Sequence, residues 1–122
     1  MIKSILLVAI GGSLGTVLRY VANILVSKNM PNKLHFATFT VNILGCLLIG
    51  FLIGYLSKHS ESENLKLLLI TGFCGGFTTF STFGLENYSF IQSGNIITSL
   101  IYTALSIIIG ILFVGIGIYL AK

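Results

Sequence analysis

Four stretches of the chain are long, apolar and almost free of charge, at residues 4–26, 35–56, 65–91 and 96–121. A helix needs about 20 apolar residues to cross the hydrocarbon core of a bilayer. The first stretch follows Met1-Ile2-Lys3 as a secretory signal would, but it lacks a small-residue cleavage site and is longer than the apolar region of a signal. The sequence therefore predicts an all-α membrane protein with four transmembrane helices.

The composition excludes a soluble fold. Charged residues make up 8% of the 122 residues, and the mean hydropathy is +1.01, whereas a soluble domain is about 25% charged. Four spans with short loops leave no room for a second domain, so we expect one transmembrane domain over residues 1–122, in the plasma (inner) membrane. Cys46 and Cys74 both fall inside apolar stretches, and we interpret them as small buried residues rather than as a disulfide.

Basic residues are few and lie at both ends of the predicted bundle. The net charge is +4, and the lysines are scattered singly, which gives no indication of a nucleic-acid partner. One end would hold four lysines, together with the acidic residues of the 57–64 loop: Lys3, Lys58, Lys66 and Lys122. The other end would hold two lysines, Lys28 and Lys33. Such a weak bias permits insertion in both orientations. Our hypothesis is that two opposite copies pair as an antiparallel, dual-topology homodimer.

Two polar side chains lie well inside the first two stretches. Arg19 can snorkel to the membrane surface, or it can attract anions at the mouth of a path. Asn42 lies amid apolar residues, where its amide can bind a neighbouring helix or donate to a dehydrated anion. An ionisable or strongly polar residue at membrane depth is in general a candidate functional residue.

The third stretch contains the run TGFCGGFTTFSTFG at residues 71–84. Paired glycines and β-branched threonines make a poor continuous helix, so we expect a break near Gly75–Thr78. Backbone carbonyls freed at membrane depth need protein or a cavity around them, and they can coordinate a small cation.

Aromatic and polar residues follow this break at helical spacing. Phe80, Phe83 and Glu86 are three apart and would share one helix face. Because an aromatic ring has a positive edge, two such edges can stabilise an anion weakly enough for it to leave again; the alternative is simple packing. Ser81 and Thr82 would add hydroxyl donors on neighbouring faces.

The run GGFTTFSTF at residues 75–83 closely resembles the signature of the Fluc/CrcB fluoride channel family. The stretch GGSLG at residues 11–15, continuing to Arg19, is similar to the family's glycine-rich first helix. TFTVNILG at residues 38–45 is similar to its second-helix motif. Ala37 stands where the family pattern has glycine. The resemblance covers essentially the whole chain.

This resemblance implies an antiparallel homodimer with two pores that exports toxic fluoride passively through the bilayer. Phe80 and Phe83 would line the pore, and Asn42 would donate to fluoride. The carbonyls of Gly75 and Thr78 would bind a structural Na⁺ at the dimer interface. The resemblance also implies that Arg19 is a vestibule arginine and that Glu86 is the acidic position. Tyr102 and Ser106 would form a polar track on the last helix.

Three other classes of protein fit the sequence less well than a fluoride channel. A small dual-topology drug or cation exporter needs a membrane-embedded carboxylate, but Glu86 comes late in its span and Arg19 disfavours cationic substrates. A scaffold subunit would not explain the combination of Arg19, Asn42 and a broken span. An enzyme is not expected, because no triad is present and His35 and His59 lie at span edges, where we interpret them as interfacial.

Overall fold

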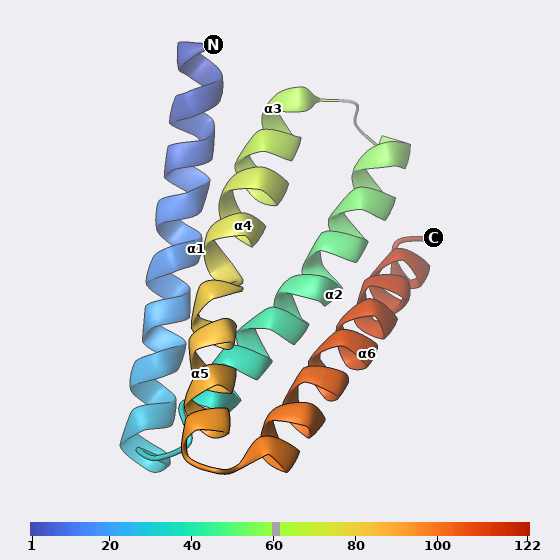
Figure 1. The fold of residues 1–122 in the computed structure, drawn as a ribbon. Coiled ribbons are helices and arrows are strands. Elements are labelled where there is room, and N and C mark those ends of the chain that lie inside the picture. The colour runs from blue at the N-terminus through green and yellow to red at the C-terminus, as the bar shows by residue number, and fades with distance from the viewer. Residues whose placement is uncertain (60–61) are drawn as a thin grey trace.

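The structure is a computed structural model that describes residues 1–59 and 62–122, and every regular element within these ranges is a helix (Figure 1). The elements are α1 (Ile2–Asn29), α2 (His35–His59), α3 (Glu63–Leu65), η1 (Lys66–Cys74), α4 (Gly75–Phe77), α5 (Ser81–Gln92) and α6 (Ile96–Leu120). Of the polar loop expected at residues 57–64, Ser60 and Glu61 lie outside the described residues.

Four segments are long and apolar enough to cross a membrane: Ile2–Asn29, His35–His59, Glu63–Gln92 and Ile96–Leu120. A 25-residue helix is about 38 Å long, which exceeds the roughly 30 Å hydrocarbon core. Only 11% to 33% of the apolar window of each segment is buried within the chain, so most apolar side chains point outward. This confirms the predicted four-span membrane fold, with each helix close to its expected bounds; the assignment of a single domain stays a prediction.

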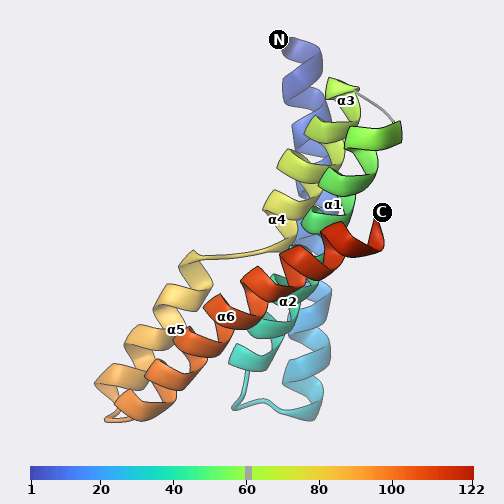
Figure 2. The same ribbon diagram turned by 90° about the vertical axis from the view of Figure 1, so that its right-hand side faces the viewer.

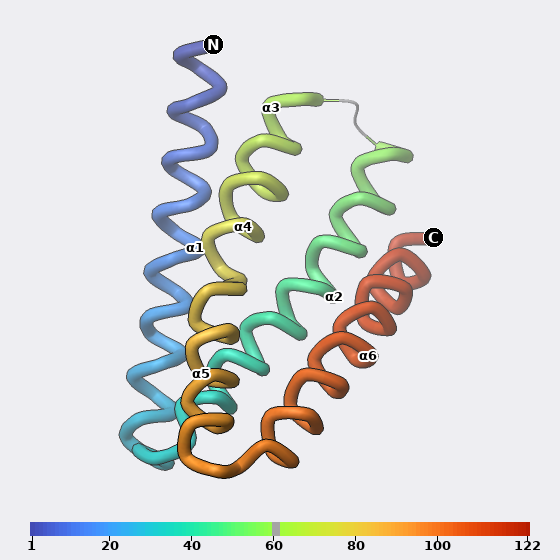
Figure 3. The backbone as a smooth tube through the Cα atoms, in the orientation of Figure 1, coloured from blue at the N-terminus to red at the C-terminus, as the bar shows by residue number. Residues whose placement is uncertain are grey.

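The helices form two closely packed pairs. α1 lies against η1 and α4, and α2 lies against α6; the tube in Figure 3 shows both pairs along their length. The two termini lie toward one end of the bundle, and the α1–α2 and α5–α6 connections lie at the other (Figure 1). Lys58 Nζ donates to the carbonyl of Ala121 at 3.4 Å, which brings the end of α2 to the C-terminus.

Glycines allow the helix backbones within each pair to approach closely. A β-carbon on Gly15 would collide with the carbonyl oxygen of Phe73, and one on Gly117 with that of Leu47. Close approach of this kind is how helices associate in lipid, where burial of apolar surface drives little association.

The third span is not one continuous helix. After the π-helix η1, Gly75 is still helical (φ −62°, ψ −38°), but Thr78 is extended (φ −91°, ψ 162°). Figure 2 shows α5 displaced sideways from α4 and lying beside α6. The expected break is therefore confirmed, and it falls at Thr78–Phe80, after the paired glycines.

Candidate functional site

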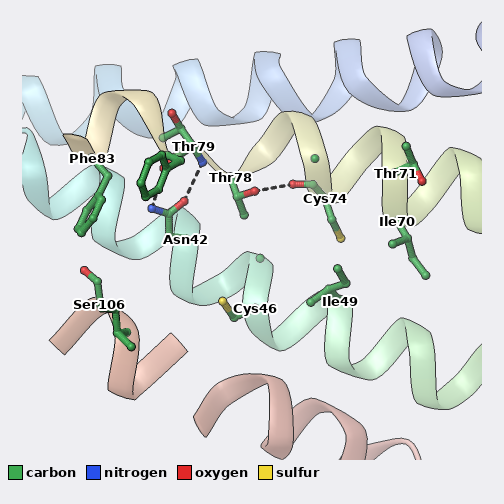
Figure 4. A pocket seen from close by; sticks show the side chains of 14 residues that line it. Asn42, Cys46, Ile49, Ile70, Thr71, Cys74, Thr78, Thr79, Phe83 and Ser106 are labelled. Atoms are coloured by element: carbon green, nitrogen blue, oxygen red, sulfur yellow. Dashed lines mark hydrogen bonds between the residues drawn. The ribbon is translucent and has the colours of Figure 1, made fainter. Parts of the chain in front are cut away.

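The break is held by a side chain of α2. Asn42 Nδ2 donates to the carbonyl of Thr79 at 3.0 Å, and the Thr79 amide donates to Asn42 Oδ1 at 2.8 Å (Figure 4). One amide side chain thus supplies both partners that the extended backbone loses when the helix stops. Of the two alternatives for Asn42, an interhelical hydrogen bond is the one observed, and its second Nδ2 hydrogen is still available.

A side chain of α1 binds the other side of the break. Arg19 Nε donates to the carbonyl of Gly76 at 3.0 Å, and Thr16 Oγ1 donates to the same oxygen at 3.4 Å. This carbonyl would normally accept from Phe80, which lies beyond the break. The contact holds Arg19 toward the break, and its terminal nitrogens make no hydrogen bond or ion pair within the described ranges.

Two carbonyls at the break lose their helical donors. The Thr79 amide binds Asn42 rather than the Gly75 carbonyl, and the Thr82 amide donates to Thr79 Oγ1 at 3.3 Å rather than to the Thr78 carbonyl. A β-carbon on Gly75 would meet no atom within 4 Å, so the space beside it is open. In the described part of the chain, no three His, Cys, Asp or Glu side chains gather around a point. These carbonyls are hence the better candidates for cation ligands, since hard cations prefer oxygen.

A groove of about 580 Å³ opens beside the break, between α2, the third span and α6. It is lined by polar, aromatic, small and aliphatic residues: Asn42, Gly45, Cys46, Ile49, Ile70, Thr71, Cys74, Gly75, Thr78, Thr79, Phe80, Phe83, Ser106 and Ile107. The Phe80 side chain is 82% exposed although it lies at the centre of the span. The groove is consequently open to whatever surrounds an isolated copy.

Four of the predicted pore residues line this groove: Asn42, Phe80, Phe83 and Ser106. The rings of Phe80 and Phe83 lie 5.9 Å apart, and the ring of Phe83 lies edge-on to that of Tyr102 at 5.0 Å. Figure 4 shows the Ser106 hydroxyl directed toward Phe83. Ser106 Oγ is buried and has no hydrogen-bond partner within the described residues, so it is free to bind a small ligand.

Beyond the groove, Glu86 is bound by two hydroxyls. Thr38 Oγ1 donates to one carboxylate oxygen and Tyr102 Oη to the other, each at 2.8 Å. The polar track expected on α6 therefore reaches the acidic side chain of α5, and it runs from Ser106 to Tyr102, one helical turn away.

Some residues differ from the expectation. The side chains of Ser81 and Thr82 do not line the groove. Sequence reasoning gave no role to Thr38 or Thr79, which hold Glu86 and the break. Thr38 lies four residues before Asn42 on the same helix face. This spacing was the signal in the sequence that could have indicated a role for Thr38.

Fold and site together define a small multi-pass membrane protein whose broken third span borders a polar and aromatic groove. The family model described as CrcB-like protein, Camphor Resistance (CrcB), matches residues 6–118, and the chain belongs to this family. The resemblance seen in the sequence is thereby confirmed.

Curated relatives cover nearly the whole chain. A protein of Flavobacterium psychrophilum is 45% identical over 121 residues, which are 98% of each chain. One of Azobacteroides pseudotrichonymphae is 45% identical over 123 residues, covering 100% of this chain and 98% of the relative. One of Gloeothece citriformis is 44% identical over 118 residues, covering 97% and 96%. All three are named fluoride-specific ion channel FluC, which is a class of channel and not of enzyme.

Proposed function

We propose that this chain is a fluoride-selective channel through which the toxic anion leaves the cell passively. The observation that carries the proposal is the buried Ser106 hydroxyl, which has no partner and faces a groove lined by the rings of Phe80 and Phe83. The names of the relatives support fluoride as the ion.

Fluoride is small and strongly hydrated, so a path must replace its water with several donors. Ser106 offers a hydroxyl, and Asn42 offers its second amide hydrogen from a position held by two bonds to Thr79. The edges of Phe80 and Phe83 add weak positive potential. No donor here carries a full charge, which favours the release of the ion as well as its entry.

Arg19 supplies the positive charge near this path. Its terminal guanidinium nitrogens remain free while Nε holds the Gly76 carbonyl. A fixed cation that is partly shielded from water raises the local concentration of anions. We assign it to the vestibule on this ground.

A second, antiparallel copy would close the groove. Phe80 is 82% exposed in a single copy, and the groove opens away from α1 between α2 and α6. An opposite copy would bring the two breaks together at the middle of the membrane and enclose two equivalent paths. The weak lysine bias of the two ends permits this pairing.

The carbonyls of Gly75 and Thr78 would hold a Na⁺ ion between the two copies. Both lack their helical donors, and the space beside Gly75 is open. When bound, the ion supplies a positive charge that neutralises carbonyl dipoles at mid-membrane. Two oxygens per chain leave the coordination incomplete, so the partner copy has to contribute the remainder.

The test is efflux from liposomes that contain the purified protein, comparing fluoride with chloride. We expect fast efflux of fluoride and little of chloride, with fluoride efflux reduced by Phe80→Ile and by Asn42→Ala. Phe51→Ile is the matched control, because Phe51 stacks on Tyr55 at 5.8 Å and does not line the groove. If folded dimers released neither anion, the channel function would be refuted and a small cation exporter would become the better interpretation.

A further inference from the structure

His35, the first residue of α2, lies among aromatic rings. Its ring centroid is 4.6 Å from that of Phe36, 5.1 Å from that of Phe90 and 5.6 Å from that of Tyr102. The side chain is half-buried. It is therefore a histidine built into the packing of α2, α5 and α6, and not a freely solvated side chain.

This cluster continues the polar and aromatic track of the groove. Phe83 lines the groove, its ring contacts Tyr102, and Tyr102 contacts His35. A second cavity of about 230 Å³ has His35 and Tyr102 in its wall, together with Phe36, Phe39, Thr98, Ile101 and Leu105. His35 thus lies where the track from the groove reaches the end of the bundle that carries the α1–α2 and α5–α6 connections (Figure 1).

The charges around His35 determine the effect of its protonation. The ionisable groups at this end are Tyr102 of α6, Glu86 and Tyr88 of α5, Lys28 in the last turn of α1 and Lys33 before α2. Lys33 Nζ lies 5.9 Å from the centroid of the Phe36 ring. Glu86 is the one acid among them, and its two carboxyl oxygens accept from Thr38 and Tyr102. A cation at His35 would add positive charge at this end of the track.

We propose that His35 is a titratable residue of the anion path, so that fluoride conduction rises when it is protonated. This inference rests on the proposed fluoride channel function. A histidine changes charge between about pH 5 and 8. The imidazolium adds positive charge beside the Tyr102 cavity and attracts the anion to the end of the track, whereas the neutral ring adds none.

The experiment is fluoride current across a planar bilayer, with the same pH on both sides because antiparallel copies place one His35 at each face. Current is measured because hydrogen fluoride crosses lipid without carrying charge. We expect the current to rise about three- to tenfold from about pH 8 to about pH 5.5, the low end of what charge in a cleft does to ion entry. Added impermeant salt should reduce the rise by screening.

Three variants separate this role from a structural one. We expect His35→Gln to stay at the low current at both pH values and His35→Lys to stay at the high one. His59→Gln is the matched control and should follow the unaltered protein, because the His59 ring lies 4.3 Å from the Tyr55 ring at the opposite end of α2.

A current that is independent of pH in the unaltered protein, or a His35→Gln variant that keeps the full rise, would overturn the inference while leaving the channel function intact. Absence of fluoride current at every pH would instead refute the proposed function, and this inference with it. If one His35 variant fails to fold, the other variant and the salt dependence of the current test the inference.

Discussion

At the scale of single residues, the buried side-chain polar atoms of the described residues are paired, with one exception. The Asn87 side chain, for example, accepts from Ser99 at 2.8 Å and Thr103 at 3.0 Å and donates to the Phe83 carbonyl at 2.9 Å. Within the described residues, Ser106 Oγ is the buried side-chain atom that lacks a partner. A buried hydroxyl without a hydrogen bond costs about 1–3 kcal/mol, so Ser106 Oγ does not contribute to stability through a hydrogen bond within the described residues.

Ser106→Ala should therefore separate stability from conduction. We expect the free energy of unfolding to stay the same or rise by up to about 1 kcal/mol, because no hydrogen bond is lost. Fluoride efflux should fall about tenfold, which corresponds to losing one donor worth about 1.4 kcal/mol. Ser13→Ala is the control, since the Ser13 hydroxyl donates to the Ala9 carbonyl on exposed α1. Unchanged fluoride efflux in Ser106→Ala would remove Ser106 from the path.

At the scale of elements, the contact between α1 and the third span positions the break. A β-carbon on Gly76 would collide with the Gly12 carbonyl, and one on Gly15 with the Phe73 carbonyl. This close approach lets Arg19 reach the Gly76 carbonyl. The two helices and the break therefore depend on one packed surface.

Gly15→Ala should destabilise the protein by about 1–3 kcal/mol, because the added methyl group forces backbones apart. Gly115→Ala is the matched change on α6, where a β-carbon meets no atom within 4 Å, and it should be neutral or stabilise by up to about 1 kcal/mol. Thermal unfolding in detergent measures both. Equal effects of the two substitutions would show that close packing at Gly15 does not hold the break.

At the scale of the whole molecule, a single copy leaves the centre of its site open. The exposed Phe80 ring and the carbonyls of Gly75 and Thr78 lie at membrane depth without a covering element. Such groups are tolerated in a bilayer only when protein or a cavity surrounds them. The open face thus supports assembly with a second copy.

Removal of Na⁺ should weaken the proposed dimer. In detergent, we expect the protein to elute as a dimer in sodium buffer and to dissociate, or to unfold at a lower temperature, when a bulky organic cation replaces Na⁺. Binding of an ion to the folded dimer alone shifts the equilibrium by mass action. An equivalent potassium buffer tests whether the site selects the ion. A dimer equally stable in all three buffers would refute a structural Na⁺ at these carbonyls.

Much of this fold could be predicted because its determinants are local in the sequence. The length and hydropathy of each stretch predicted the four helices, and the paired glycines Gly75-Gly76 together with the threonines after them predicted the break. The three-residue spacing of Phe80 and Phe83 brought both rings to one groove, as the structure has them. Ser81 and Thr82, whose hydroxyls were expected on neighbouring faces, are not among the residues that line the groove, and their role stays a prediction.

The sequence by itself determined that this protein lies in lipid. It also determined the number and limits of the spans, since hydropathy and helix length act within each segment. Only the tertiary structure decided which polar groups are already paired. Asn42 and Arg19 bind the break, Thr38 binds Glu86, and Ser106 remains free. The reason is physical: in a medium without water, a polar atom must find its partner on another helix, and that partner depends on how the helices pack.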